Sequence, residues 1–263
     1  MKNSLSYRIF SFIVCVISAM VFMFPLILML LKSFDKKGFE NYAKVFETVK
    51  LVPNFKTSII VVFGTLLVVS IVSSMASFAF SKTSFPKKSQ IYYILLTGMM
   101  IPTSALVFPL FQIVKGLGLN NTPFSLILPY ATLNAIFNLM VLKNFFDGLP
   151  NELMEAAHID GAGLWRIFVE IMFPLSIPGL AIVLIQTFLL SWNELQMAMI
   201  FINKTAIQPI SVVPLRFMQA TSNSYPIGIM YASLVICLTP IALFYIGAQK
   251  FLVQGLTAGA VKG

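Results

Sequence analysis

Residues 150–174 read PNELMEAAHIDGAGLWRIFVEIMFP, a polar and acidic stretch in a chain that is 58% hydrophobic. Four of the nine acidic residues of the chain lie in this segment, together with its only histidine. The leading proline suits the first position of a helix, and Glu152 and Glu155 come early enough to complement the helix dipole. Gly161 and Gly163 then break or bend that helix. We therefore expect a short helix beside a membrane, held between two longer apolar segments.

The composition of the chain excludes an ordinary soluble domain. Its mean hydropathy is +0.90 and only 10% of its residues are charged, whereas soluble domains carry about 25%. Lysine and arginine give a formal net charge of +9, but they separate the apolar runs, which favours anchoring at membrane interfaces over nucleic-acid binding. We therefore predict an all-α membrane protein, because backbone groups in lipid must be paired within the segment.

Six apolar runs are long enough to cross a hydrocarbon core, which takes about 20 helical residues. The predicted spans are residues 9–31, 57–80, 91–114, 124–142, 175–202 and 227–249. Residues 1–263 then form a single transmembrane domain without a separate soluble part. Because the number of spans is even, both termini lie on the same side of the membrane.

The distribution of lysine and arginine does not decide which side that is. With both termini in the cytoplasm, nine basic residues fall inside and nine outside. The short SKTSFPKKS loop (81–89) favours the cytoplasmic side, but the lysines that follow the first span favour the opposite orientation. The rule that cytoplasmic loops are positive therefore leaves the orientation open.

A motif in the acidic segment resembles that of a known family. Its residues are Glu155, Ala156, Ala157, Gly161, Ile171, Phe173 and Pro174. Their spacing is similar to the EAA signature of permease subunits of binding-protein-dependent ABC importers, in which leucine stands where this chain has Phe173. Further segments resemble the carbohydrate branch, of maltose type: MMIPTSALVFPLF (99–111), LGLNNT (117–122), LLSWNELQMAMIF (189–201) and GLTAGAVKG (255–263).

The resemblance implies a type I ABC importer permease fold with six transmembrane helices and a cytoplasmic EAA coupling helix. In this family that helix sits in a cleft of an ATPase subunit and couples ATPase closure to alternating access. The coupling loop 143–174 and both termini would then be cytoplasmic. The tail 250–263 would reach between paired ATPase subunits, although a frayed terminus is the alternative.

The resemblance also implies roles for the residues of the EAA motif. Glu155 would make a polar contact with the ATPase, Ala156 and Ala157 would permit its close approach, and Gly161 would form the turn. Asp160 would either contact the partner or cap the following segment; the sequence does not decide between the two.

Two other regions are candidates for contact with substrate or a partner. Asn193 and Glu194 are polar residues within a predicted span, and such residues either line a transport path or bond a neighbouring helix. The loop from about residue 203 to 226, with Pro209, Pro214 and Gln219, matches the position of the family loop that probes the binding protein. An ordinary surface connection is the alternative for this loop.

The function implied is that of the transmembrane permease subunit of an ATP-driven carbohydrate importer, with an oligosaccharide as cargo, in the bacterial cytoplasmic membrane. The chain has no G-x-x-x-x-G-K-[ST] motif, so we expect no catalytic residues and no bound cofactor of its own. With one histidine and no cysteine cluster, we expect no metal site either. ATP and Mg would be bound by the partner ATPase. The implied partners are a second permease subunit, two ATPase subunits, an extracellular solute-binding protein and the lipid bilayer.

Three other functions are alternatives to this one. A permease for a non-sugar solute is the nearest alternative, and the GLTAGAVKG tail argues against it. A secondary transporter would need several intramembrane acids or a lysine pair, and only Glu194 qualifies. A scaffold subunit without a transport path is the third.

Overall fold

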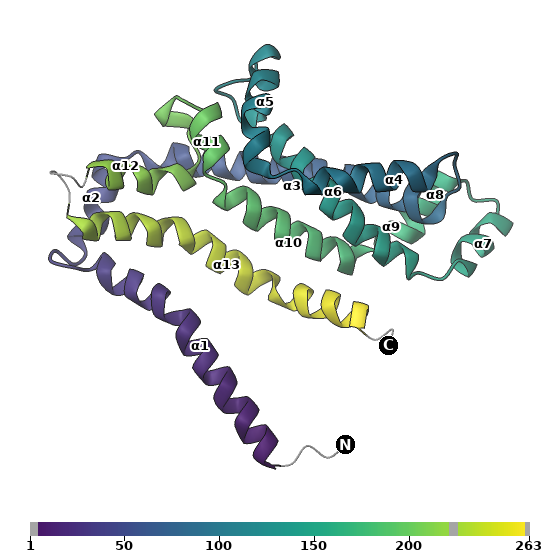
Figure 1. The fold of residues 1–263 in the computed structure, drawn as a ribbon, viewed down its shortest axis with the longest axis horizontal. Coiled ribbons are helices and arrows are strands. Elements are labelled where there is room, and N and C mark those ends of the chain that lie inside the picture. The colour runs from purple at the N-terminus through teal and green to yellow at the C-terminus, as the bar shows by residue number, and fades with distance from the viewer. Residues whose placement is uncertain (1–4, 221–225, 261–263) are drawn as a thin grey trace. The chain divides into compact units, whose positions relative to one another are not determined.

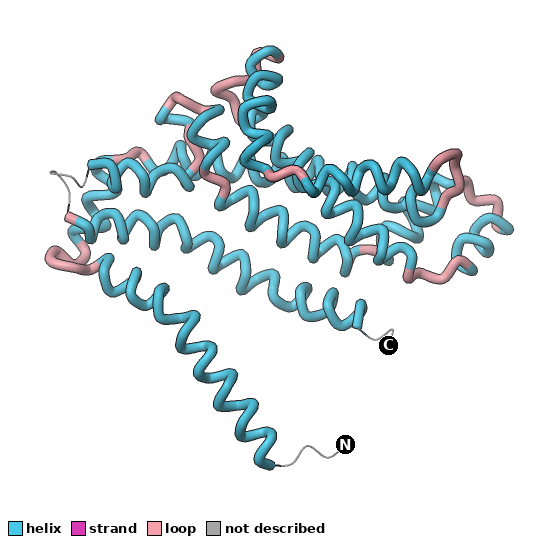
Figure 2. Tube along the Cα trace, viewed as in Figure 1, coloured by secondary structure: helices cyan, strands magenta, loops and turns pink. Residues whose placement is uncertain are grey.

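The structure is a computed structural model that describes residues 5–220 and 226–260. These residues form helices joined by turns, with no β-strand among them (Figures 1 and 2). The chain divides into two compact units: unit 1 comprises Met1–Leu51 and Val212–Pro240, and unit 2 comprises Val52–Ser211 and Ile241–Gly263. The predicted all-α fold is therefore confirmed.

Unit 1 contains α1 (Leu5–Ser33), α2 (Glu40–Thr48), α12 (Val213–Ala220) and the first part of α13 (Ile227–Ala260). A buried amide ties its helices together. Asn41 donates through Nδ2 to the backbone oxygens of Ser33, at 3.0 Å, and Asp35, at 2.9 Å. Gly228 lies against the same amide, because a Cβ at this glycine would be 2.5 Å from the Asn41 nitrogen.

The first helix is apolar on all sides. Its segment Tyr7–Ser33 is long and apolar enough to cross a membrane, and none of the most apolar window is buried inside the chain. A helix without a polar face is stable only in lipid or among other helices. The predicted first span is thus present as a helix, slightly longer than 9–31.

Unit 2 is built around α6 (Phe124–Asp147). The helices that contact α6 are α4 (Lys88–Thr97), α5 (Thr103–Gly116), α10 (Ile177–Asn193) and α11 (Gln196–Phe201). The long α3 (Leu51–Lys82) is joined to α6 by a hydrogen bond of 3.0 Å from Ser77 Oγ to the Leu139 oxygen. The short α7 (Glu152–Ile159) lies at one end of the unit, and α5 turns away from the bundle (Figure 1).

Small and polar side chains allow the helices of unit 2 to approach closely, as is usual in membranes. At the contact between α10 and α6, a Cβ on Gly179 would lie 2.7 Å from ring carbons of Phe145. Across the same pair of helices, Asn138 Nδ2 donates to Thr187 Oγ1 at 2.9 Å. Both contacts are buried among apolar neighbours, so they fix the register of α10 on α6.

The predicted span 91–114 is not one straight helix. Its two helical parts, Lys88–Met100 and Thr103–Gly116, meet at an angle of 103°. The break falls where Pro102 lacks a backbone N–H and forces the preceding Ile101 into an extended conformation, with ψ of 119°. Ile101 and Pro102 are both compatible with an apolar run, so hydropathy alone does not predict the bend.

The predicted span 175–202 is interrupted as well. α10 ends at Asn193, and Glu194 has extended backbone, with ψ of 127°, before α11 begins. At its other end, the helical stretch Leu164–Leu175 joins α10 at 73°. In the described residues, four helices are long and apolar enough to span a membrane, or up to six if each bent pair is one span.

The last predicted span, 227–249, agrees with the segment Ile227–Lys250, which is long and apolar enough to cross a membrane. α13 continues without a break from Ile227 to Ala260. The last three residues, 261–263, lie outside the described part of the chain.

Candidate functional site

The acidic segment forms α7, a turn and a second helical stretch that begins with α8 (Leu164–Ile167). Loops lie on both sides of α7 (Figure 2). Glu152 and Glu155 are in its first turn, as the sequence suggested. Gly161 makes the turn after α7 with a φ of +78°, a left-handed conformation that glycine adopts without strain.

α7 has one face in the core and one face exposed. Met154 and Ala157, three residues apart, are buried in the core of unit 2. Glu155 and Ala156 are exposed, and Ile159 is 87% exposed. Ala157 therefore packs into the core of its own chain, whereas Ala156, which the motif pairs with it, is exposed.

Asp160 does not cap the following helix. Gly163 holds the N-cap position of α8, and no side chain makes a capping hydrogen bond there. The backbone N–H of Asp160 donates to the Ala156 oxygen at 3.1 Å, which closes α7. Its side chain is exposed, like that of Glu155. The capping alternative is thus not formed, and the contact of Asp160 with a partner stays a prediction.

Lys82, at the end of α3, anchors the start of this segment and was not singled out from the sequence. Its Nζ donates to the backbone oxygen of Leu149 and to Asn151 Oδ1, both at 2.7 Å. These bonds connect a long spanning helix directly to the residue that precedes α7. A lysine at the end of an apolar run is also the ordinary pattern of a membrane anchor, so no local pattern distinguishes Lys82 from the other lysines.

Glu194 lies at the break between α10 and α11 and makes four hydrogen bonds. Its carboxylate accepts one from the Tyr130 hydroxyl of α6, at 2.5 Å. It also accepts the backbone N–H groups of Met197, at 2.8 Å, and Ala198, at 3.0 Å, at the start of α11. Its backbone oxygen accepts from Ser211 Oγ at 2.8 Å. The carboxylate thus caps α11 and bonds a neighbouring helix, which is one of the two predicted alternatives.

The same carboxylate lines a small cavity of about 160 Å³, together with Tyr130, Asn134 and Ser191. Asn193 is exposed, and its amide donates to the Leu189 oxygen at 2.8 Å. In the described part of the chain, no group of three or more His, Cys, Asp or Glu side chains could hold a metal ion. The cavity therefore offers hydrogen-bonding groups that include a single carboxylate.

In the described residues of the predicted contact loop, 203 to 226, exposed positions lie at 203–206 and at Met218. Pro209 and Pro214 are buried. At the first of these exposed positions, Asn121 Oδ1 accepts the backbone N–H groups of Asn203, at 2.7 Å, and Lys204, at 3.2 Å. Gln219 lies in α12, and its side chain is outside the described part, as are residues 221–225.

Comparison with known proteins gives one family. The model of the binding-protein-dependent transport system inner membrane component matches residues 74–258. The chain is 31% identical, over 90% of its own length and 83% of the other, to the diacetylchitobiose uptake system permease protein of Streptomyces coelicolor. It is also 31% identical to the trehalose/maltose transport system permease protein of Thermococcus litoralis, over 100% of both chains.

A solved structure has the same fold. One chain from the crystal structure of a bacterial ABC transporter involved in the import of the acidic polysaccharide alginate superposes with a TM-score of 0.79. The superposition covers 95% of this chain and 99% of the other, at 22% sequence identity. At this identity the likeness concerns the fold alone.

Proposed function

The chain belongs to the family of binding-protein-dependent transport system inner membrane components, and from this premise we propose that it is the permease subunit of an ATP-driven carbohydrate importer. The observation that carries the proposal is the similarity to a trehalose/maltose permease at 31% identity over the whole of both chains. A second relative with a sugar named as its cargo, diacetylchitobiose, supports an oligosaccharide. A permease for a non-sugar solute is the alternative.

The outward face of α7 is the proposed docking surface for an ATPase subunit. Glu155 and Asp160 supply carboxylates, and Ala156 supplies a small side chain that lets a partner come close. Gly161 sets the direction of the chain beyond the helix. The hydrogen bonds from Lys82 to the start of this segment support the coupling role, since they link the docking helix to a spanning helix.

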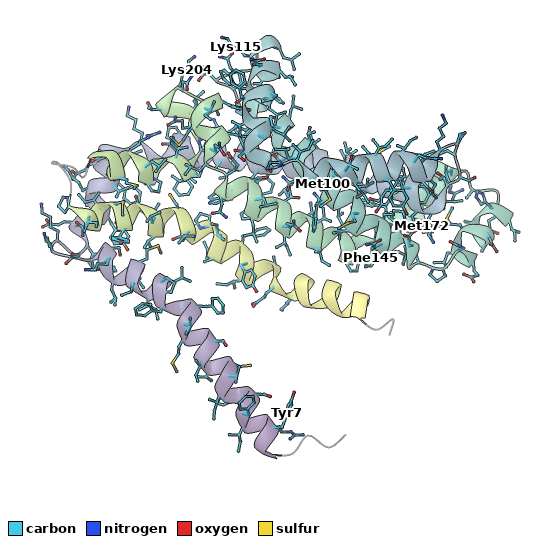
Figure 3. The ribbon with its side chains drawn as sticks, viewed as in Figure 1. Tyr7, Met100, Lys115, Phe145, Met172 and Lys204 are labelled. Atoms are coloured by element: carbon cyan, nitrogen blue, oxygen red, sulfur yellow. The ribbon has the colours of Figure 1, made fainter. Side chains whose placement is uncertain are left out.

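The chain is an inner-membrane component by family, and its orientation is part of the proposal. We place the coupling loop 143–174 and both termini in the cytoplasm. Phe145 and Met172 lie toward the end of unit 2 that carries α7, whereas Lys115 and Lys204 lie away from it (Figure 3). The latter end would then face the binding protein, with the exposed segment 203–206 available for contact.

The chain is a transport subunit and not an enzyme in this scheme. ATP and Mg would be bound and used by two separate ATPase subunits, and a second permease subunit would complete the membrane part. A soluble binding protein outside the membrane would deliver the sugar, in keeping with the description of the family.

The break between α10 and α11 is the proposed border of the translocation path. Glu194 fixes the geometry of the break through its bonds to Tyr130 and to the start of α11. Asn193 is exposed beside it and has an amide oxygen and nitrogen that suit sugar hydroxyls. A cavity of about 160 Å³ is too small for an oligosaccharide, so the path must open during transport.

The test is the ATPase activity of the complex purified through a tag on this chain, reconstituted with its binding protein. A panel of mono- and oligosaccharides is compared with amino acids and peptides. We expect stimulation by one class of glycan. Stimulation by amino acids or peptides alone would retain the importer and overturn the carbohydrate assignment, and a complex without copurifying ATPase would overturn both.

A further inference from the structure

A polar pocket lies where three helices of unit 2 end. Lys82 is the last residue of α3, Lys88 the first of α4 and Asp147 the last of α6. α3 and α6 are spanning helices by length and hydropathy, and α4 begins a bent pair that passes the same test. The pocket has a volume of about 210 Å³. Charged residues at the ends of apolar helices mark the membrane interface, so the pocket is placed at the level of lipid headgroups.

The charges in the pocket suit one negative group. Lys88 and Lys143 line it with two ammonium groups, and Asp147 adds one carboxylate, which leaves a net charge of +1. Lys143 Nζ is 2.6 Å from Asp147 Oδ2 and 5.2 Å from the centre of the Tyr92 ring. Lys88 Nζ donates to the neutral backbone oxygens of Ser81, at 3.2 Å, and Thr83, at 2.7 Å. Because neither acceptor carries a charge, the positive charge of Lys88 is not neutralised.

The pocket continues into an apolar surface that would lie in the hydrocarbon. Ser89 and Tyr93 line the pocket from α4, and they lie four residues apart on one helix face. Tyr93 is 66% exposed, and the adjacent Ile94 is 69% exposed. Further along, Met100 is 83% exposed (labelled in Figure 3). A polar pocket followed by an exposed apolar stripe fits an amphiphile, and it does not fit an acidic protein segment.

We propose that this pocket binds the phosphodiester headgroup of an anionic phospholipid, whose acyl chains lie along the exposed face of α4. The ammonium groups of Lys88 and Lys143 contact the phosphate, and the hydroxyls of Ser89 and Tyr93 supply further donors. Tyrosine is also the residue type enriched at this depth. The site would lie in the cytoplasmic leaflet if the proposed function and orientation hold. The choice of an anionic headgroup does not depend on that function.

Native mass spectrometry of the full chain, in its complex, tests the proposal by counting lipids retained during a titration. The probes are phosphatidylglycerol, the zwitterionic phosphatidylcholine and inorganic phosphate. Lys143→Gln should weaken phosphatidylglycerol binding about fivefold, the effect of one basic residue near an anionic lipid. Asp147→Asn should strengthen it, because the competing carboxylate is gone, and a misfolded variant would not give such a gain. Lys87→Gln is the matched control, because Lys87 is adjacent to Lys88 but does not line the pocket.

Each outcome decides the proposal. Weakening by Lys143→Gln and strengthening by Asp147→Asn, with Lys87→Gln unchanged, supports a defined headgroup site. Equal weakening in the Lys143 and Lys87 variants would show diffuse attraction and overturn it, as would equal retention of the two lipids. If inorganic phosphate displaces the lipid at equal affinity, the pocket is a phosphate site. Lipid binding is measured independently of transport. If sugars do not stimulate the ATPase but the lipid is still retained, the importer proposal fails and the lipid site stands.

Discussion

The turn after α7 allows the docking proposal to be tested through the backbone alone. Gly161 has a φ of +78°, whereas Gly163 has a φ of −70°. No heavy atom lies within 4 Å of a Cβ built on either glycine. Alanine at both positions therefore adds the same methyl group into open space, and only Gly161→Ala strains the backbone. Left-handed conformation costs a residue other than glycine about 1–2 kcal/mol.

That cost predicts a change in coupling. A difference of about 1–2 kcal/mol shifts an equilibrium by a factor of about 5 to 30, so the turn in Gly161→Ala should populate other conformations that misdirect α7. We expect the number of sugars imported per ATP hydrolysed to fall in reconstituted vesicles, with Gly163→Ala close to wild type. Gly161→Asn should recover most of the coupling, because asparagine tolerates this conformation better.

The comparison of Gly161→Ala with Gly163→Ala can also refute the proposed role of this turn in coupling. If Gly161→Ala and Gly163→Ala transport with the same ratio of sugar to ATP, the geometry of this turn does not matter for coupling. If Gly161→Ala lowers the amount of assembled complex but not the ratio, the turn serves folding alone. Both quantities are measured on one preparation, by ATPase assay and uptake of labelled sugar.

Other variants test the packing around the site. Ala157→Leu should lower the free energy of unfolding by about 1–3 kcal/mol, because the larger side chain overpacks the core. Ala156→Leu lies on the exposed face, so it should change the free energy of unfolding by less than about 0.5 kcal/mol but weaken copurification of the ATPase. Equal thermal stability of the two variants would contradict the assigned faces. Tyr130→Phe removes the hydroxyl bound by Glu194 and should cost about 0.6 kcal/mol, at most 1.7, measured by thermal unfolding in detergent. Gly179→Ala should cost about 1–3 kcal/mol, since its Cβ would lie 2.7 Å from ring carbons; full stability would show that the helices can separate at no cost.

The membrane fold and the family could be predicted because each rests on a strong local signal. Apolar runs of sufficient length allow only helices in lipid, and each predicted run is mostly helical, with breaks near Pro102 and Glu194. The bends could not be predicted from hydropathy, which is continuous across Pro102. A proline within an apolar run is compatible with a kink as well as with a sharp break, and only packing against α6 decides.

The faces of α7 show where a motif was less informative than periodicity. The EAA resemblance treats Ala156 and Ala157 alike. Met154 and Ala157, however, are three residues apart and so lie on one helix face, and that face is the buried one. The pattern was present in the sequence. Glu194 is the opposite case, because its bond to Tyr130 joins residues 64 positions apart, which no local pattern reveals.

The even count of nine basic residues on each side hides a difference in how they are placed. Near α7, Lys82, Lys88 and Lys143 come from three different helices, and each makes hydrogen bonds that hold its ammonium group at the helix ends. The segment between α3 and α4 that contributes to this cluster is short, and short loops weigh most in the rule for orientation. A fixed positive cluster at one end of three spans favours the cytoplasmic, anionic leaflet. The structure thus supplies support for the proposed orientation that a count of charges along the chain does not.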